Sequence, residues 1–385
     1  MRVTIVSRIY RPEPAAASIY LGAVADELLA QGEDVDVITA SPPRGMAPHP
    51  RGERVRTFPV LRDANGYVRG YLPYLSFDIP LAVRLLVARR PDVVFMEPPP
   101  TTGIVVRVIC ALRRIPYVYD AADIWSDAAQ LEPVSPVVIT VLRAMERFAL
   151  RGAARIVTIS QGVVDRLRLL GIDRPVAVTG FGADTREFPP AFAEPERLFV
   201  YAGSYSASHG AEIVVDAFAA FLAHHPGYVL RFIGNGSERP TVESRAEELG
   251  VAASVEYLDP VPPAELLPHL AAAVASVATI RPSTVYEYSY ASKVFSSLSA
   301  GCPVIFAGPG PTAAVLHEAN RQVRAGIACA YDAREIADAM TELAARRVAP
   351  EQRMALGEWT AEEHSMSAVA RRVVDVLRTA ARRRG

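Results

Sequence analysis

The chain has 385 residues, of which 50% are hydrophobic and 22% charged, and its formal net charge is −1. This length exceeds one ordinary core and predicts two domains of roughly 150–200 residues each, while the near-neutral charge excludes an overall electrostatic attraction to nucleic acid or to an anionic membrane. Three widely spaced cysteines, an apolar strand directly after Met1-Arg2 and the lack of an apolar run of bilayer length predict a reduced cytoplasmic protein without a signal peptide.

The first half of the chain alternates short apolar strands with amphipathic helices. This rhythm predicts a parallel sheet covered on both faces, a type of sheet that binds ligands at the carboxyl ends of its strands. We expect strands at residues 3–6, 35–39, 55–60, 93–96, 117–119, 156–159 and 176–178, with helices at 18–30, 79–88, 102–112, 136–150 and 161–170.

The periodicity stops between Phe181 and Glu196, where one glycine and three prolines indicate a linker. The alternation then restarts and predicts a second doubly wound domain. Its strands are expected at residues 198–202, 229–233, 255–258, 276–279, 304–306 and 327–330, and its helices at 212–223, 241–249, 263–272, from 292 for about two turns, 312–319, 333–346 and about 351–382.

Residues 292–305 combine features of a phosphate site at the start of a helix. Ser292 is suited to N-capping, and an Ala-Gly-Cys-Pro break after about two turns leads into a buried strand. A helix N-terminus offers unpaired amides and a positive dipole end, where a cation such as Lys293 is disfavoured unless an anion binds. A diphosphate would suit this arrangement. The alternative is a solvated lysine on a helix that only packs against a sheet.

Glycine turns follow three expected strands of the second half. Glycine lets backbone N–H groups approach a phosphate or a base, although turns of this kind often need glycine for their own geometry. Together with Lys293 these turns favour a nucleotide site, and the lack of a P-loop or early dinucleotide fingerprint argues against a nucleotide triphosphatase or a dehydrogenase. The turns are Gly203-Ser204, Gly234-Asn235-Gly236 and Gly308-Pro309-Gly310.

An acidic stretch that includes Asp120, Asp123, Trp125 and Asp127 directly follows the strand expected at 117–119. Carboxylates and a tryptophan there suit a polyhydroxylated acceptor, with one carboxylate as proton acceptor. The alternative is that Asp120 and Asp123 cap the next helix and that Trp125 belongs to the core. Two further acceptor candidates lie in turns for which a plain connection is the alternative: Glu97 in a Pro-rich turn and Glu13 in the loop after the first strand.

The remaining polar residues are weaker indications of a functional site. His209 opens a helix near the expected phosphate site, and Arg281 follows the strand at 276–279, so both are donor candidates. The histidines and cysteines show no metal-ligand spacing, so no metal is expected. The basic residues of the long helix at 136–150 and of the C-terminal tail would touch anionic lipid or form a solvated face.

With these motifs in place, the whole chain resembles the retaining family-4 glycosyltransferases of the GT-B fold. It is most similar to a branch from bacterial surface-polysaccharide pathways that carries Asp-Leu-Trp-Pro-Glu and Ser-Lys-hydrophobic-Phe-Glu motifs. The resemblance implies an α/β protein of two Rossmann-like doubly wound domains facing a central cleft. The corresponding residues are Asp123-Ile124-Trp125-Ser126-Asp127, Ser292-Lys293-Val294-Phe295-Ser296, the linker Phe181-Gly182-Ala183-Asp184 and the donor loop Gly234-Asn235-Gly236.

The resemblance assigns residues 1–182 to an acceptor-binding domain, residues 183–365 to a nucleotide-sugar-binding domain and residues 366–385 to a terminal helix that crosses back to the first domain. It implies catalytic roles for Asp123 and Lys293. The donor would be bound by Gly203, Ser204, His209, Gly234, Gly236, Arg281, Glu287, Ser292 and Ser296, and the acceptor by Glu13, Glu97, Asp120 and Trp125.

The chain departs from the family pattern at donor positions. Ser296 stands where the family has a glutamate assigned to the donor ribose, and the upstream acid falls on Tyr288, with Glu287 one residue out of phase. The usual Arg/Lys pair after the first C-terminal strand is missing, which leaves His209 there. A charge-assisted hydrogen bond is worth about 1.5–3 kcal/mol, so losing the glutamate would weaken donor binding roughly ten- to a hundredfold.

The activity implied by the resemblance is metal-independent transfer of a hexosyl or N-acetylhexosaminyl group from a nucleotide sugar, UDP-GlcNAc or another UDP-hexose, to an acceptor hydroxyl with retained stereochemistry. No cofactor and no nucleic acid are expected, and the acceptor would be a hydroxylated small molecule or a lipid-linked sugar. A cytoplasmic location would fit this activity, either without membrane contact or with peripheral contact at the inner membrane face. The alternatives are a nucleotide-sugar epimerase and a catalytically silent binding subunit.

Overall fold

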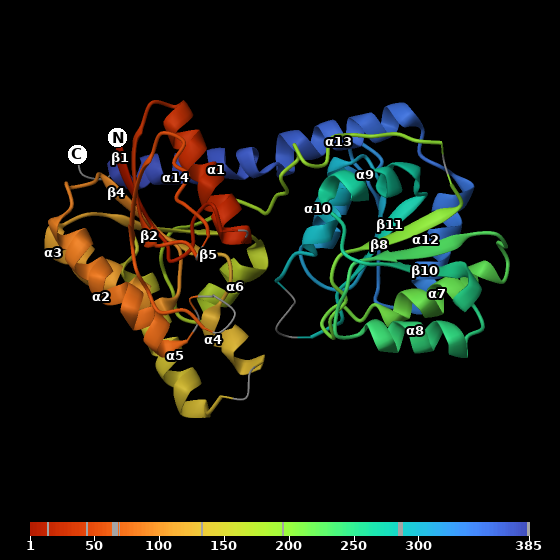
Figure 1. Ribbon diagram of the computed structural model, residues 1–385, viewed down its shortest axis with the longest axis horizontal. Coiled ribbons are helices and arrows are strands. Elements are labelled where there is room, and N and C mark those ends of the chain that lie inside the picture. The colour runs from red at the N-terminus through yellow and green to blue at the C-terminus, as the bar shows by residue number, and fades with distance from the viewer. Residues whose placement is uncertain are drawn as a thin grey trace. The chain divides into compact units, whose positions relative to one another are not determined.

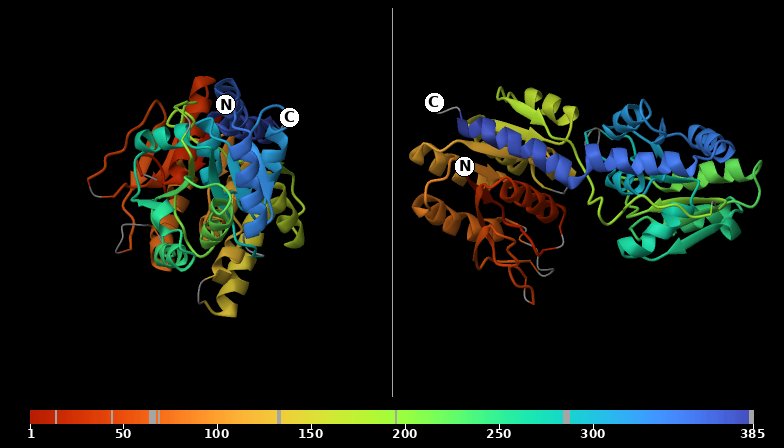
Figure 2. Two further views of the ribbon diagram at one scale, coloured as in Figure 1. Left: turned by 90° about the vertical axis from the view of Figure 1, so that its right-hand side faces the viewer. Right: turned by 90° about the horizontal axis from the view of Figure 1, so that it is seen from above.

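The computed structural model describes residues 1–13, 15–43, 45–63, 68, 70–131, 134–194, 196–283 and 288–382. The chain divides into two compact units (Figure 1). The N-terminal unit comprises Met1–Gly180 and Val369–Gly385, so both ends of the chain belong to it (Figure 2), and the C-terminal unit comprises Phe181–Ala368. Each unit is built on a parallel sheet, as the alternation of strands and helices predicted.

The N-terminal unit has a seven-stranded sheet in the order β3-β2-β1-β4-β5-β6-β7. Helices α1 and α14 pack their apolar residues on one face of this sheet, while α2, α3 and α5 form the layer on the other face. The strands are β1 (Arg2–Val6), β2 (Asp34–Ala40), β3 (Arg54–Phe58), β4 (Val93–Met96), β5 (Tyr117–Ala121), β6 (Arg155–Thr158) and β7 (Val176–Val178). The helices are α1 (Ala16–Ala30), α2 (Tyr71–Val87), α3 (Pro100–Arg113), α4 (Trp125–Ala128), α5 (Pro136–Gly152), α6 (Gln161–Leu169) and α14 (Met366–Arg382).

The C-terminal unit has a six-stranded sheet in the order β10-β9-β8-β11-β12-β13. Alternate residues of its strands face opposite helical layers: Phe199 and Tyr201 pack with α7, α8 and α12, whereas Val200 and Ala202 pack toward α9. The strands are β8 (Leu198–Ala202), β9 (Val229–Ile233), β10 (Val255–Leu258), β11 (Ala275–Thr279), β12 (Val304–Ala307) and β13 (Gly326–Cys329). The helices are α7 (Glu212–Leu222), α8 (Arg239–Glu248), α9 (Pro263–Ala272), α10 (Ser292–Ser299), α11 (Thr312–Ala319), α12 (Ala333–Ala345) and α13 (Pro350–His364).

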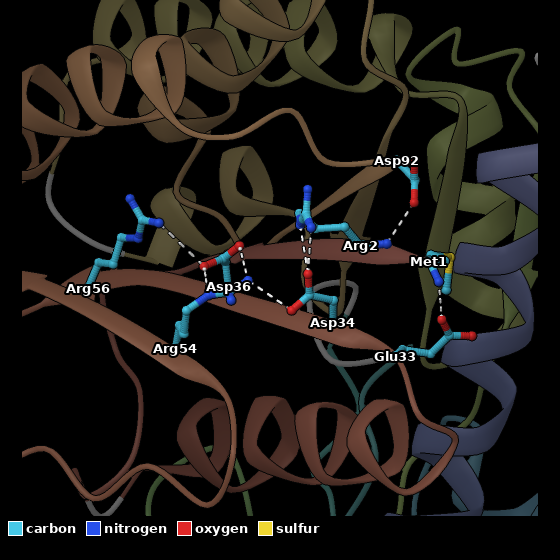
Figure 3. A network of polar contacts seen from close by, with 8 residues as sticks. All are labelled: Met1, Arg2, Glu33, Asp34, Asp36, Arg54, Arg56 and Asp92. Carbon is cyan, nitrogen blue, oxygen red and sulfur yellow. Dashed lines mark hydrogen bonds and ion pairs between the residues drawn. The ribbon is translucent and has the colours of Figure 1, made fainter.

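Cross-strand ion pairs fasten the edge strand β3 to the first sheet (Figure 3). Arg54 on β3 bonds Asp36 at 2.9 Å and Asp34 at 2.8 Å on β2, and Arg2 on β1 bonds Asp34 at 2.7 Å. Each partly exposed pair contributes at most about 1 kcal/mol. Charges on an edge strand also discourage pairing with another sheet.

Two helices differ from the expected pattern. Helix α2 begins at Tyr71 rather than at residue 79; Pro73 fits its first turn, and Pro80 is accommodated inside the helix. Neither it nor any other helix of the described residues has the length and hydropathy needed to cross a membrane. The helix expected at 351–382 is two helices, α13 and α14, separated at Ser365. Ala183 fixes this break, since its backbone accepts from the N–H of Met366 at 2.9 Å and donates to the carbonyl of His364 at 3.0 Å.

Candidate functional site

The carboxyl ends of β8 and β11 form the switch point of the C-terminal sheet. The chain runs outward from β8 to β9 and β10 and then resumes beside β8 at β11. Parallel sheets bind ligands at such a point, because connections leave the two neighbouring strands in opposite directions. The turn 203–211 leaves β8 here, and the segment after β11 leads into α10; Glu287, a predicted donor residue of that segment, lies outside the described residues.

Lys293, in the first turn of α10, reaches the turn after β8. Its Nζ donates to the hydroxyl of Tyr201 at 2.8 Å and to the carbonyl of Ser204 at 3.0 Å, and it lies 4.1 Å from the centroid of the Tyr201 ring. Burial lowers the pKa of Lys293 to about 7. It makes no ion pair with any carboxylate in the part of the chain that the structure describes. An anionic ligand would therefore supply the counter-charge that the protein itself does not.

Lys293 is also unusual in the composition of the chain. Of the 41 lysine and arginine residues, it is the only lysine. A lysine is a compact point charge whose pKa shifts readily on burial, whereas a planar guanidinium stays charged and needs more room. The single lysine thus stands where a compact amine bonds both a tyrosine hydroxyl and a turn carbonyl.

The start of α10 presents backbone amides next to this lysine. The N-cap is Ala291, not Ser292 as predicted, and it offers no side-chain acceptor to the first turn. The N–H groups of Ser292 and Lys293 therefore lack an intrahelical acceptor. Phe295 anchors the helix, since it is fully buried with its ring centroid 5.3 Å from that of Phe181 and 5.4 Å from that of Tyr290.

Ser296, the position that departs from the family pattern, lies one turn after Ser292. Residues four apart share a face of a helix, so Ser296 and Ser292 line the same side of α10. Ser292 is exposed and Ser296 half-buried. The structure thus places a neutral hydroxyl, without the acid expected from the family, along this face.

The glycine turns pack tightly against one another. A Cβ at Gly234 would lie 2.2 Å from the carbonyl oxygen of Gly203, and a Cβ at Gly236 would lie 2.1 Å from that of Tyr205. The hydroxyl of Tyr205 also donates to the carbonyl of Gly234 at 3.0 Å. The contact that demands glycine at 234 and 236 is therefore with the neighbouring turn, while Gly203 lies closer to Lys293, whose Cε would be 3.4 Å from a Cβ there.

His209 lies in the same turn as an uncharged side chain. Its Nδ1 is 2.9 Å from the hydroxyl of Ser206. Burial, with a smaller effect from the charge of Lys293, lowers the pKa of His209 to about 4. The imidazole is therefore neutral near pH 7 and adds a hydrogen-bonding group, but no second cation, to the surroundings of the lysine.

Arg281 braces the turn after β8. Its guanidinium pairs with Glu212 and bonds Tyr331, and its backbone N–H donates to the carbonyl of Ser208 at 2.9 Å. The hydroxyl of Tyr331 in turn donates to the carbonyl of Gly210 at 2.7 Å. The charge of Arg281 is thus compensated within the protein, in contrast to that of Lys293.

The N-terminal unit gathers acidic side chains at the corresponding edge of its own sheet. Because Val6 pairs with Met96 and Met96 pairs with Tyr119, the residues Ser7, Glu97 and Asp120 follow one another across three strands. The hydroxyl of Ser7 donates to Glu97 at 2.9 Å. Burial raises the pKa of Glu97 and, more strongly, the pKa of Asp120. The negative charges of Glu97 and Asp123 raise the pKa of Asp120 further.

Asp123 is the accessible member of this acidic group. Asp120 is only 5% exposed and Glu97 is half-buried, whereas Asp123 is exposed. The protein around the carboxyl of Asp123 displaces enough water to raise its pKa. A carboxylate with a raised pKa is a stronger base, and only an accessible one can reach the hydroxyl of a ligand.

Arg8 is a site residue that the sequence reasoning missed. Its guanidinium lies 4.8 Å from the ring centroid of Tyr74 and 5.1 Å from that of Trp125, in the geometry of cation–π contacts. Arg8 is 8% exposed, and its Nε and Nη1 have no hydrogen-bond partner among the described residues. Its charge lowers the pKa of Glu97, opposing the larger effect of burial. Glu146, also missed, holds Trp125 by accepting from its backbone N–H at 2.7 Å.

Two other acidic residues form ion pairs with arginines. Arg62 binds both oxygens of Glu13, at 2.9 and 3.0 Å. Arg166 binds Asp127 in the same two-pronged way, at 2.5 and 2.6 Å. Paired in this manner, neither carboxylate is available as a base, so Glu13 remains an acceptor candidate only through its position in the loop after β1.

Among the residues that the structure describes, no group of three or more His, Cys, Asp or Glu side chains is placed to hold a metal ion. The cysteines Cys110 and Cys302 are buried and unpaired, and burial raises the pKa of both thiols. Such thiols are poor ligands because the thiolate is the binding form.

Two doubly wound parallel-sheet units define the GT-B class of glycosyltransferase fold, and solved structures of that class resemble the whole chain. Sucrose-phosphate synthase from Thermosynechococcus elongatus superposes with a TM-score of 0.66 at 16% identity, over 98% of each chain. HepE from Anabaena in complex with UDP gives a TM-score of 0.66 at 15% identity, over 98% of this chain and 100% of that one.

Family matches identify the two units. Residues 16–182 match the family described as glycosyl transferase 4-like domain, and residues 196–346 match glycosyl transferases group 1. Each of the two units is thus similar over most of its length to a glycosyltransferase domain. A D-inositol 3-phosphate glycosyltransferase from Corynebacterium urealyticum is 25% identical over 227 residues, 53% of this chain and 51% of the relative. The chain spans about half the length of the curated relatives that it matches.

Proposed function

We propose that this protein transfers a sugar from a nucleoside-diphosphate sugar to an acceptor hydroxyl. The observation that carries the proposal is Lys293: a cation without a carboxylate partner among the described residues, next to free amides of α10 and at the switch point of the C-terminal sheet. A diphosphate matches this site in charge and in hydrogen bonding. The two glycosyltransferase domains support the same class of reaction.

In this proposal the donor is UDP-GlcNAc or another UDP-hexose. Uridine is favoured because HepE, a structural neighbour, was solved with UDP. Lys293 and the α10 amides stabilise the negative charge that develops on the departing diphosphate, a task that a metal ion performs in other enzymes. Transfer proceeds without a metal and with retained stereochemistry.

Asp123 receives the acceptor hydroxyl in the N-terminal unit. Its accessible carboxylate positions or deprotonates that hydroxyl, and Trp125 with Arg8 and Tyr74 forms the wall beside it. The acceptor is a hydroxylated small molecule or a lipid-linked sugar; the relatives from Corynebacterium are named for a phosphorylated inositol. Peripheral contact with a membrane belongs to the lipid-linked version of the proposal.

Two alternatives share this architecture, a nucleotide-sugar epimerase and a catalytically silent binding subunit. An epimerase would interconvert donor sugars without any acceptor. A silent subunit is motivated by Ser296, where the family has an acid. Neither gains support from the matched families, which are named as glycosyltransferases.

Titration calorimetry with UDP, ADP and GDP, followed by incubation with a panel of UDP-sugars and acceptors, tests the proposal. We expect UDP to bind with a dissociation constant on the order of micromolar, and UDP to be released from one UDP-sugar only when an acceptor is present. Conversion of the donor sugar without acceptor would favour the epimerase. Failure of every nucleotide to bind at millimolar concentration would contradict the proposal.

Donor binding should be linked to proton uptake. The free enzyme holds the pKa of Lys293 at about 7, below the ordinary lysine value of 10.5, and a bound diphosphate would raise it. At about pH 8 the amine is then mostly neutral before binding and charged afterwards. We expect the binding enthalpy of UDP at this pH to vary with the ionisation enthalpy of the buffer, corresponding to uptake of close to one proton. A Lys293→Met variant should show no such uptake.

A further inference from the structure

Tyr201 stands on β8 at a core position where packing alone would be satisfied by a phenylalanine. Its ring is fully buried and faces the same helical layer as that of Phe199, two residues earlier. Tyr201 pairs in register with Phe232 on β9, and their ring centroids lie 5.2 Å apart. A buried tyrosine hydroxyl needs a hydrogen-bond partner, because removing it from water without one costs stability. A hydroxyl at this position therefore needs a reason other than packing.

The hydroxyl of Tyr201 lies against the amine of Lys293. It accepts from Nζ at 2.8 Å, and the same nitrogen lies 4.1 Å from the centroid of the ring. Burial raises the pKa of Tyr201, so the phenol stays protonated and neutral beside the lysine. Tyr201 is thus a hydrogen-bond acceptor for the amine without being its counter-ion, and it leaves the positive charge of Lys293 to an anionic ligand.

The hydrogen bonds of Lys293 set the direction of its remaining donor. An ammonium group has three N–H donors. One ends on the hydroxyl of Tyr201 and another on the carbonyl of Ser204 at 3.0 Å, while the third has no acceptor among the described residues. Two hydrogen bonds hold the nitrogen in place and thereby orient the third N–H, whereas a single one would leave the end of this flexible side chain free to move.

We infer that Tyr201 is a positioning residue for sugar transfer, whose hydroxyl holds the amine of Lys293 so that the third N–H meets the departing diphosphate. The inference rests on the proposed function, because it relies on the role that Lys293 has there. A donor that is already oriented stabilises developing charge without reorganisation at the moment of reaction. Tyr201 acts only through Lys293, since a fully buried residue cannot touch the ligand itself.

The variant Tyr201→Phe tests the inference, because it removes the hydroxyl and keeps the ring beside the amine. We expect kcat to fall roughly tenfold, the effect of one hydrogen bond to a charged group. The affinity for UDP, measured by calorimetry, should change by less than about threefold, since orientation of the donor matters most in the transition state. In a Lys293→Ala background the same substitution should cause no further loss, because the group through which Tyr201 acts is absent.

A second measurement follows the amine without any sugar transfer. Because Lys293 is the only lysine, labelling lysine with ¹³C and ¹⁵N gives one set of side-chain NMR signals, whose titration reports the protonation of the amine. The hydroxyl of Tyr201 accepts from the charged form, so its removal should shift the titration to lower pH than the midpoint of about 7 in the wild type. His209, whose pKa is about 4, stays neutral over this range.

Tyr257→Phe is the matched control, with circular dichroism melting as the check on folding. The ring of Tyr257 also packs on Phe232, with the centroids 5.6 Å apart, but its hydroxyl donates to the carbonyl of Val242 at 3.4 Å. The control therefore removes a tyrosine hydroxyl from the same aromatic cluster without touching the amine. Turnover and the titration of Lys293 should both stay at the wild-type values.

Unchanged kcat in a folded Tyr201→Phe protein would overturn the inference, as would an unchanged titration of Lys293. An equal loss in Tyr257→Phe would assign the effect to packing on Phe232 instead. A loss of the same size with and without Lys293 would show that the hydroxyl does not act through the amine. A wild type that neither binds UDP nor transfers sugar would contradict the proposed function, and the titration would then still decide whether Tyr201 holds the amine.

Discussion

Replacing Lys293 with alanine is expected to lower the rate of sugar transfer by roughly 10²–10³-fold. The substitution removes the cation that bonds Tyr201 and the carbonyl of Ser204 and that lacks any described carboxylate partner. Stabilisation of a developing diphosphate charge is greatest in the transition state, so kcat should fall more than the affinity for UDP. Steady-state kinetics with saturating acceptor, together with calorimetry, measure the two effects separately.

Folding should survive this change. The low pKa of Lys293 means that the native state disfavours its charged form, so removing the amine relieves a penalty. Since the unfolded chain binds more protons between about pH 7 and 10.5, this lysine makes native stability rise with pH across that window, and the alanine variant should lose that part of the slope. Arg239→Ala, which breaks exposed ion pairs with Glu243 and Asp259, is the matched control. Unchanged turnover in a folded Lys293→Ala protein would contradict the assigned role.

Lys293→Arg should not restore activity. A guanidinium is larger, planar and always charged, and it cannot occupy the position 2.8 Å from Tyr201 and 3.0 Å from the carbonyl of Ser204 without displacing the turn. The arginine variant therefore separates a need for positive charge from a need for a compact amine. Full activity in Lys293→Arg would show that charge alone suffices.

Replacing Asp123 with asparagine should lower turnover by roughly 10²–10⁴-fold, the range for loss of a general base. Asparagine keeps the shape and removes the proton acceptor, so UDP affinity should stay near that of the wild type because the donor residues belong to the C-terminal unit. Asp165→Asn, at an exposed acid of α6 that pairs with Arg168, is the control. In the pH–rate profile of the wild type, turnover should rise as the pH passes through the raised pKa of Asp123. The Asp123→Asn variant should not show this rise.

Glu97 is the competing base for the same reaction. It is half-buried, accepts from Ser7 at 2.9 Å and lies near the charge of Arg8, so its oxygens are less available than those of Asp123. Glu97→Gln should therefore reduce turnover less than Asp123→Asn does. The reverse order of effects would transfer the role of base to Glu97.

The fold was largely readable from the sequence because buried strands and amphipathic helices have different periods. Each expected strand is found among the described residues, within a few residues of its expected range. Errors arose where tertiary contacts override local signals. Helix α2 continues through two prolines because its inner face is buried, and α13 stops at His364 because Ser365 pairs with the distant Ala183. No local pattern encodes either contact.

The site was predicted less completely than the fold. Asp123 closely follows β5, so the rule for parallel sheets located it, whereas Lys293 was located by its position at the start of the predicted helix. Arg8 and Glu146 act through partners far along the chain, and their sequence surroundings resemble ordinary turns and helices. Conversely, Asp127 looks like a site acid from its spacing, but Arg166, 39 residues away, pairs with it. Long-range pairing is the information that spacing does not contain.

Because Lys293 is the only lysine of the chain, reagents that modify lysine side chains can react at a single position. Amine-directed chemistry that spreads over many surface positions in most proteins can modify only one lysine side chain here. Reductive methylation with ¹³C-formaldehyde would label Lys293 and, as the second primary amine, the α-amine of Met1. The signal that is absent from the Lys293→Ala variant then belongs to Lys293; its titration reports the pKa, and its chemical shift reports nucleotide binding. Acylation of the same nitrogen would remove its charge.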